Sequence, residues 1–262
     1  EQRDVMVVND MDMLQLLVDN DLVENLTQVY EDCTSSRIKD IYNSYGSEIL
    51  DNVTFDGKLV ALPETNIDDG PSLCWLRKDW MDKLGLDAPE TVEDVENIVH
   101  EFVQKDPGGN GKGETVGLVC DDELTGGCGY SYEYQNDIIF ASFGAFPKQW
   151  IYNKDGEVVY GSVQNEAKAA LGKLRQMYQQ GTLDNNFLMR ESSNIIELIV
   201  SGKCGSFFGP WWSPNNPLMS AMQKNPNAEW QPYLIQTDKD RQTSFASQNP
   251  NHKYVVVRKG SK

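Results

Sequence analysis

The fold of this chain is most clearly indicated by one stretch, Gly205-Ser206-Phe207-Phe208-Gly209-Pro210-Trp211-Trp212-Ser213-Pro214. Its apolar run from Ser206 to Phe208 predicts a buried strand, and the Gly-Pro pair that follows predicts a turn. A helix-like run, Leu218 to Met222, comes next. The two tryptophans therefore lie on a loop at the carboxyl end of a strand, where open α/β sheets bind their ligands. The alternative is that one or both indoles belong to the hydrophobic core.

Length, composition and charge limit the class of protein. With 262 residues, 39% of them hydrophobic, the chain is long enough for one large or two medium domains with a packed core. Its net charge of −17 argues against nucleic acid, whose phosphates require Lys and Arg, and against an anionic membrane surface. No run approaches the ~20 apolar residues of a membrane helix. The charge fits a neutral or cationic partner, or simply a solvated acidic surface.

Predicted strands and helices alternate along the chain. Strands are predicted for residues 4–8, 58–62, 72–76, 116–120, 232–235 and 254–257. A helix is predicted from Asn165 to Gly181, with Leu171, Leu174 and Tyr178 facing inward. Lys154-Asp155-Gly156 between two apolar segments indicates a hairpin. This alternation is typical of the α/β class.

The sequence contains little that points to catalysis. It has two histidines, His100 and His252, both in polar contexts, and it lacks a G-x-S-x-G elbow, a P-loop and a G-x-G-x-x-G motif. Its 40 Asp and Glu residues still permit a carboxylate pair of the kind that cleaves glycosides. A carbohydrate-active enzyme is therefore kept as an alternative.

Five cysteines leave the redox environment open. No pair has the C-x-x-C spacing of a zinc or redox site. Cys120 and Cys128 flank a Gly-rich turn, and their spacing permits a disulfide. The odd count leaves at least one thiol free unless it pairs between chains.

The Gly-rich loop from Asp106 to Thr115 resembles part of a calcium-binding loop, which places oxygen ligands at positions 1, 3, 5, 7, 9 and 12 and glycine at position 6. The matching residues are Asp106, Asn110, Gly111, Lys112 through its backbone carbonyl, and Glu114. Position 3 is Gly108 and position 12 is Gly117, neither of which has a ligating side chain. A structural calcium ion is the prediction, and a plain turn after a helix is the alternative.

Aromatic and polar residues together indicate a sugar-binding surface. Trp211, Trp212 and Tyr134 offer flat faces to the apolar C–H groups of a sugar ring. The polar loop containing Glu64 and Asn66 offers partners for sugar hydroxyls. Each of these residues alone is also compatible with an ordinary surface position.

Several stretches in order resemble the extracellular solute-binding proteins of carbohydrate ABC importers, similar to maltose- and alginate-binding proteins. They span nearly the whole chain and are Asp4 to Val8, Asp56 to Pro63, Leu73 to Leu86, Pro89 to Thr91, and Ser201 to Trp212. In that family the Trp after Gly-Pro stacks on a sugar, and an earlier aromatic does the same. The resemblance assigns these roles to Trp211 and Tyr134, and it also places the family's calcium loop at Asp106 to Glu114.

The resemblance implies a periplasmic-binding-protein-like fold of two α/β lobes joined by a hinge. One lobe comprises residues 1–66 and 236–262, and the other residues 67–235. A first strand and helix and the C-terminal helices of the family are missing from this sequence, so it is expected to be a fragment with an incomplete first lobe.

The implied function is capture of an oligosaccharide outside the cell and its delivery to a permease, without enzymatic activity. The expected protein is a monomer in the periplasm or on the cell surface, where a lipid would anchor the full-length protein. A carbohydrate-active enzyme and a glycan sensor or adhesion subunit are the alternatives.

Overall fold

The computed structural model describes residues 3–65, 72–126, 133–237, 243 and 251–261. The chain divides into two compact units, Glu1–Asp68 with Gln248–Lys262, and Asp69–Ser247. Ile235 is buried in the core of the second unit. No helix within the described ranges is both long and apolar enough to cross a membrane.

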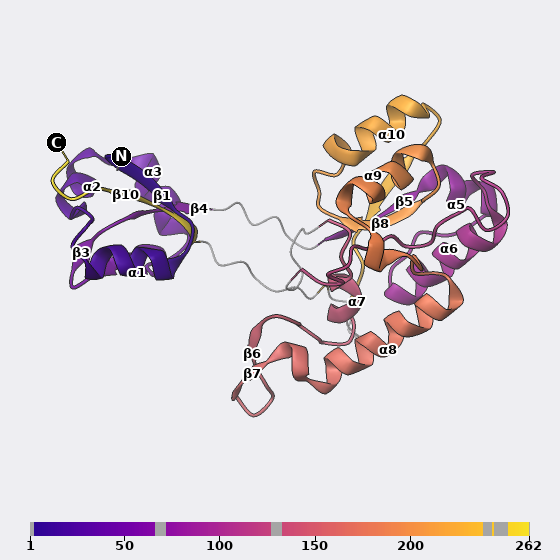
Figure 1. Ribbon diagram of the computed structural model, residues 1–262, viewed down its shortest axis with the longest axis horizontal. Coiled ribbons are helices and arrows are strands. Elements are labelled where there is room, and N and C mark those ends of the chain that lie inside the picture. Colours follow the sequence, from indigo (N-terminus) through magenta and orange to yellow (C-terminus); the bar gives the residue numbers. More distant parts are fainter. Residues whose placement is uncertain (1–2, 66–71, 127–132, 238–242, 244–250, 262) are drawn as a thin grey trace. The chain divides into compact units, whose positions relative to one another are not determined.

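The first unit is built on an antiparallel sheet with the strand order β1-β10-β4 (Figure 1). Its elements are β1 (Val5–Val8), α1 (Met11–Asp19), α2 (Thr27–Cys33), α3 (Ser36–Ser44), α4 (Glu48–Asp51), β2 (Thr54–Phe55), β3 (Lys58–Leu59), β4 (Leu62–Thr65) and β10 (Asn251–Val257). In the central strand β10, Tyr254 and Val256 are buried, as the two-residue period of a strand requires. They pack with helix residues such as Leu14 and Ile49.

The second unit contains the sheet β8-β5-β9, in which β5 pairs antiparallel with both neighbours. Its elements are β5 (Leu73–Arg77), α5 (Lys78–Leu84), α6 (Val92–Lys105), α7 (Asp137–Ala141), the hairpin β6 (Trp150–Tyr152) and β7 (Val158–Tyr160), α8 (Asn165–Gln180), α9 (Ser192–Ser201), β8 (Ser206–Gly209), α10 (Met219–Lys224) and β9 (Trp230–Tyr233). Short helical turns lie at Gly161–Val163, Phe187–Met189 and Pro214–Leu218. The alternation of helices and strands confirms the predicted α/β class.

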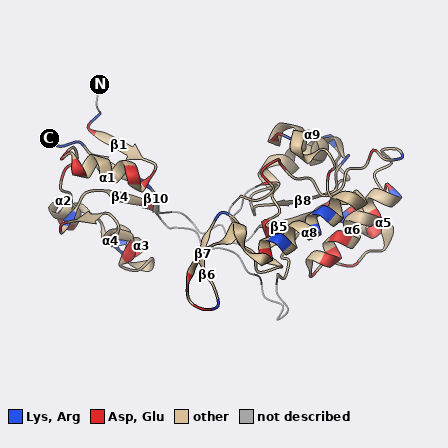
Figure 2. Ribbon diagram, turned by 60° about the horizontal axis from the view of Figure 1, so that its bottom comes forward, with Lys and Arg blue, Asp and Glu red and all other residues tan. Residues whose placement is uncertain are grey.

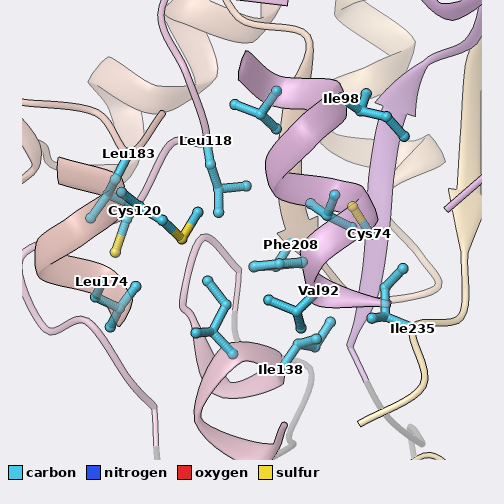
Figure 3. Close-up of a cluster of buried hydrophobic side chains, with 14 of the residues drawn as sticks. Cys74, Val92, Ile98, Leu118, Cys120, Ile138, Leu174, Leu183, Phe208 and Ile235 are labelled. Atoms are coloured by element: carbon cyan, nitrogen blue, oxygen red, sulfur yellow. The ribbon is translucent and has the colours of Figure 1, made fainter. Parts of the chain in front are cut away.

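Both faces of the sheet in the second unit are covered. Cys74, Leu76 and Phe208 belong to a core cluster that includes residues of α5, α6 and α8 (Figure 3). Trp75 and Phe207, their neighbours in sequence, belong to a second cluster with residues of α9 and α10. Because successive strand residues point to opposite faces, β5 and β8 carry apolar side chains on both faces of the sheet. The predicted buried strand from Ser206 to Phe208 is confirmed.

Three local predictions are wrong. Residues 58–62 do not form one strand, because β3 ends at Leu59 and β4 begins at Leu62. Residues 116–120 form single bridges, Val116 to Cys204 and Leu118 to Leu183, instead of a named strand. In α8, Leu171 and Tyr178 are partly exposed, and the inward positions are taken by residues such as Ala170 and Met177.

Helices α6 and α8 are joined by an ion pair between Glu96 and Lys173. Figure 2 shows Lys and Arg along α8 and Asp and Glu along α6. The pair is largely buried, so each charge requires the other.

Candidate functional site

The turn after β8 is held by hydrogen bonds to one backbone carbonyl. The Pro210 oxygen accepts from Trp75 Nε1 at 3.1 Å, from Ser213 Oγ at 2.8 Å and from the Ser213 backbone N–H at 3.1 Å. Pro210, Ser213 and Trp75 are all buried. The backbone on both sides of the two tryptophans is therefore fixed by the core of the second unit.

The turn also requires glycine at its entry. A Cβ atom on Gly209 would lie 2.9 Å from both Phe207 Cε2 and Ser213 Oγ, closer than real Cβ contacts. Gly209 therefore allows Ser213 to pack tightly against the end of β8. The Gly-Pro signal in the sequence thus has a steric cause that the sequence alone does not show.

The structure distinguishes the two tryptophans. Trp211 is 56% exposed, whereas Trp212 is half-buried. A ring that stacks on a ligand must be reachable from solvent, and Trp211 meets this condition on a rigid support. The interpretation that both indoles belong to the core is wrong.

Tyr134 does not offer a ring to solvent. Its side chain is 0% exposed and packs on Phe207 with 5.7 Å between ring centroids. Its backbone N–H donates to the Phe208 carbonyl at 2.9 Å, which places it against β8. The predicted exposed face on Tyr134 is therefore corrected to a core position next to the strand that carries the turn.

The two polar candidates from the first unit have different outcomes. Glu64 is exposed on β4, where its carboxylate lies 3.5 Å from Lys253 Nζ. Asn66 lies outside the described residues. A role for either residue in ligand binding stays a prediction.

A cavity of about 550 Å³, here called the acidic cavity, lies on the second unit. Its lining includes Asp121, Asp122, Glu123, Gln135, Arg190 and Glu191. It is linked to β8 through the backbone, because the Asp121 N–H donates to the Tyr134 carbonyl at 3.0 Å and the Tyr134 N–H donates to Phe208. Sequence reasoning missed these residues, since carboxylates are too common in this chain for the Asp-Asp-Glu run to stand out.

Asp121 occupies the most buried acidic position of this cavity. Its Oδ2 accepts from Gln135 Nε2 at 3.0 Å, and its Oδ1 accepts from the Glu123 N–H at 3.1 Å. Desolvation by burial raises the pKa of Asp121 above its ordinary value, although these two hydrogen bonds lower it. Each of its carboxylate oxygens thus accepts a hydrogen bond from the protein.

The Gly-rich loop after α6 is closed by hydrogen bonds. Asp106 Oδ1 accepts from Thr115 Oγ1 at 2.6 Å and from the Asn110 N–H at 3.0 Å, while Oδ2 accepts from the Gly111 N–H at 2.8 Å. These bonds, with the Thr115 hydroxyl first, lower the pKa of Asp106. Asn110 Nδ2 in turn donates to Thr115 Oγ1 at 3.1 Å and to the Gly202 carbonyl at 3.0 Å.

The loop supplies fewer side-chain oxygens than the six to eight oxygen ligands that a calcium ion takes. A Cβ atom on Gly108 would lie 2.6 Å from Trp80 Cζ2, and one on Gly117 would lie 2.3 Å from the Thr182 carbonyl oxygen, so the two missing ligand positions have no room for a side chain. Glu114 pairs with Lys203 at 3.0 Å. The described residues contain no group of three or more His, Cys, Asp or Glu side chains arranged for a metal.

The disulfide that the spacing of Cys120 and Cys128 permits can be examined in the structure only at Cys120. Cys120 is a free, buried thiol whose Sγ accepts from Asn136 Nδ2 at 2.8 Å and contacts the Asp121 carbonyl at 3.1 Å. Burial raises the pKa of this thiol far above its ordinary value. Cys128 lies outside the described residues.

Comparison of the sequence with known proteins identifies relatives of this chain, although no protein-family model matches it. It is 30% identical over 159 residues to Lipoprotein LipO of Bacillus subtilis (strain 168), covering 60% of this chain and 30% of that protein. It is 25% identical over 173 residues to the polygalacturonan/rhamnogalacturonan-binding protein YtcQ of the same organism, covering 64% of this chain and 32% of that protein. It is 25% identical over 146 residues to the fructooligosaccharide ABC transporter substrate-binding protein FusA of Streptococcus pneumoniae, covering 55% of this chain and 26% of that protein.

Solved structures share the fold. FusA of S. pneumoniae in complex with kestose matches 99% of this chain and 52% of its own, with a TM-score of 0.71 and 18% identity. The alginate-binding protein AlgQ2 without calcium ion matches 99% of this chain and 52% of its own, with a TM-score of 0.71 and 15% identity. An EF-hand mutant of FusA with fructo-nystose matches 98% of this chain and 52% of its own, with a TM-score of 0.71 and 19% identity.

This chain therefore spans about half the length of these structures and about a third or less of its curated relatives. The relatives have the names of a lipoprotein and of binding proteins. The chain is a homologue of lipoprotein and sugar-binding ABC-transporter substrate-binding proteins, and it has their periplasmic-binding-protein-like fold.

Proposed function

We propose that this protein captures an oligosaccharide and delivers it to the permease of an ABC importer. The observation that carries the proposal is Trp211, an exposed indole on a turn fixed by the buried Pro210 carbonyl. A rigid aromatic face binds the apolar side of a sugar ring with little loss of conformational entropy. The names of YtcQ and FusA support the sugar class.

The acidic cavity supplies the second requirement of a sugar site, which is hydrogen-bonding groups. Its Asp121 is hydrogen-bonded through the backbone to Tyr134, which in turn is hydrogen-bonded to Phe208, three residues before Trp211. Trp212, Glu64 and Asn66 remain further candidates for ligand contact. Tyr134 supports the site from the core.

The partner, location and oligomeric state follow from the same proposal. A substrate-binding protein acts outside the cytoplasmic membrane, in a periplasm or held at the cell surface by a lipid, and meets its permease as a monomer. The names of LipO and FusA support this location.

The test is isothermal titration calorimetry of the purified protein with kestose, nystose, maltotriose and a galacturonate trimer. We expect at least one of them to bind and, at 100 times its Kd, to stabilise the fold by about 2.7 kcal/mol. Chromatography of the same mixtures checks for cleavage products. Failure of every sugar to bind, or turnover of a bound sugar, would contradict the proposal.

We also propose that hydrogen bonds within the loop from Asp106 to Thr115, and not a bound calcium ion, hold this loop in its conformation. Two observations support this. Both carboxylate oxygens of Asp106 accept hydrogen bonds from the loop, and Gly108 and Gly117, at positions 3 and 12, have no space for a ligating side chain. The melting temperature should be the same in excess calcium and in a chelator. A chelator-induced decrease that calcium reverses would restore the calcium prediction.

A further inference from the structure

The hydrogen-bonding character of the acidic cavity is strongly one-sided. Four carboxylates line it, from Asp121, Asp122, Glu123 and Glu191, and an ionised carboxylate only accepts hydrogen bonds. Gln135 also lines the cavity and is 8% exposed. Its Nε2 is used by Asp121, whereas its Oε1 has no hydrogen-bond partner within the described part of the chain. Ser192 and Arg190 also line the cavity, so it offers an excess of acceptors rather than acceptors alone.

The positive charges near this cavity are already neutralised. Arg190 lines the cavity, but its Nε lies 2.6 Å from Asp184 Oδ2 and its Nη2 lies 3.3 Å from Asp184 Oδ1. Asp184 is 3% exposed, so the pair is held by the high cost of leaving that carboxylate alone. Lys148 Nζ is paired with Glu123 Oε2 at 2.6 Å. The field in the cavity is therefore negative.

These observations distinguish between classes of sugar. The hydroxyls of an uncharged oligosaccharide donate hydrogen bonds to carboxylates. A uronic acid residue brings a carboxylate, which adds an acceptor and a negative charge where both are already in excess. Like charges placed together in a binding site oppose association and are a common means of rejecting the wrong partner.

We propose that the acidic cavity selects uncharged oligosaccharides and rejects uronic-acid oligosaccharides. This inference rests on the proposed function and names the chemical class of its ligand. The expected ligand is therefore uncharged, like the kestose in a solved structure of the same fold, and unlike the polygalacturonan in the name of the relative YtcQ. Trp211 contributes the same stacking surface to either class, so the discrimination comes from the cavity.

The experiment compares affinities for chain-length-matched sugars at low and high ionic strength, in a chelator so that calcium does not bridge carboxylates. We expect the best uncharged trimer to bind at least about tenfold more tightly than a galacturonate or alginate trimer at low salt. High salt should reduce this ratio because it screens the repulsion.

Two variants assign the effect to the cavity. Asp122→Asn removes one lining charge at an exposed position and should reduce the ratio several-fold, mainly by improving binding of the acidic sugar. Glu197→Gln changes the net charge equally on the exposed side of α9, outside the cavity lining, and should leave the ratio unchanged.

Tighter binding of the acidic trimer would overturn the inference while leaving sugar capture intact. Equal effects of the two variants would overturn the assignment to the cavity. If no oligosaccharide binds, the proposed function fails and the inference fails with it.

Discussion

The turn from Gly209 to Ser213 and the loop from Asp106 to Thr115 are both closed by hydrogen bonds, but they use different atoms. In the turn, the side chains of Trp75 and Ser213 donate to the backbone carbonyl of Pro210, and the Trp211 side chain is 56% exposed. In the loop, the side-chain oxygens of Asp106 and Thr115 are themselves the closing groups. A loop that is closed at a backbone carbonyl can present a side chain to a ligand. In a loop that is closed by polar side chains, those side chains are already hydrogen-bonded within the protein.

The largest effect should come from filling the space at the turn. Gly209→Ala puts a Cβ atom against Phe207 and Ser213, so we expect a loss of about 1–3 kcal/mol in the free energy of unfolding. Gly172→Ala in α8 is the control, because nothing lies within 4 Å of its Cβ position, and it should gain up to ~1 kcal/mol. Urea unfolding measures both. Equal stability of the two variants would show that the turn is not sterically locked.

Next is the exposed ring on the turn. Trp211→Ala should reduce sugar affinity about tenfold or more, which is ~1.4 kcal/mol, because it removes the stacking face. Part of the ring is covered, so urea unfolding of the same variant is needed to separate a loss of affinity from a loss of folded protein. Trp150→Ala is the matched control, at a ring that is 72% exposed on the β6–β7 hairpin, and should leave affinity unchanged. A Trp211→Ala protein with native affinity would refute the stacking role.

The loop should respond in stability. Thr115→Val keeps the shape of a buried side chain but removes the hydroxyl between Asp106 and Asn110, with an expected cost of about 1–2 kcal/mol. Thr54→Val is the control, because its hydroxyl donates one hydrogen bond at an exposed position, and should cost less than ~0.5 kcal/mol. Denaturant midpoints with unchanged slopes would measure the difference. No loss in Thr115→Val would mean that another group closes the loop.

The smallest effect is the pH dependence of the loop. Because folding lowers the pKa of Asp106, this carboxylate stabilises the fold at pH values above its unfolded pKa of about 3.9, and the contribution is lost as pH falls through the folded pKa. Asp106→Asn should therefore be less stable than the native protein at neutral pH, with a difference that narrows in acid. Unfolding curves across this range test the sign. A difference independent of pH would mean that the charge of Asp106 is not involved.

Much of the second unit is predictable from sequence because its signals are local. The buried strand Ser206–Gly209 and the hairpin around Asp155-Gly156 depend on neighbouring residues and are confirmed. The inward face of α8 was misassigned, since Leu171 and Ala170 lie beside each other and only the packing partner decides which is buried. Tyr134 was misassigned for the same reason, because its ring is covered by Phe207 from a distant strand.

By itself, the sequence determined the α/β class and the position of the turn, since apolar runs and Gly-Pro pairs act over a few residues. The choice of Trp211 over Trp212 came from the family resemblance, and its exposure is seen only in the structure. Only the tertiary structure decided what the polar side chains do. Asp106 is occupied by Thr115, nine residues away, and the packing of Trp80 excludes a ligand at Gly108. An oxygen is already hydrogen-bonded, or still able to bind a ligand, according to which groups the fold brings within about 3 Å of it. The adjacent residues in the sequence do not determine which groups these are.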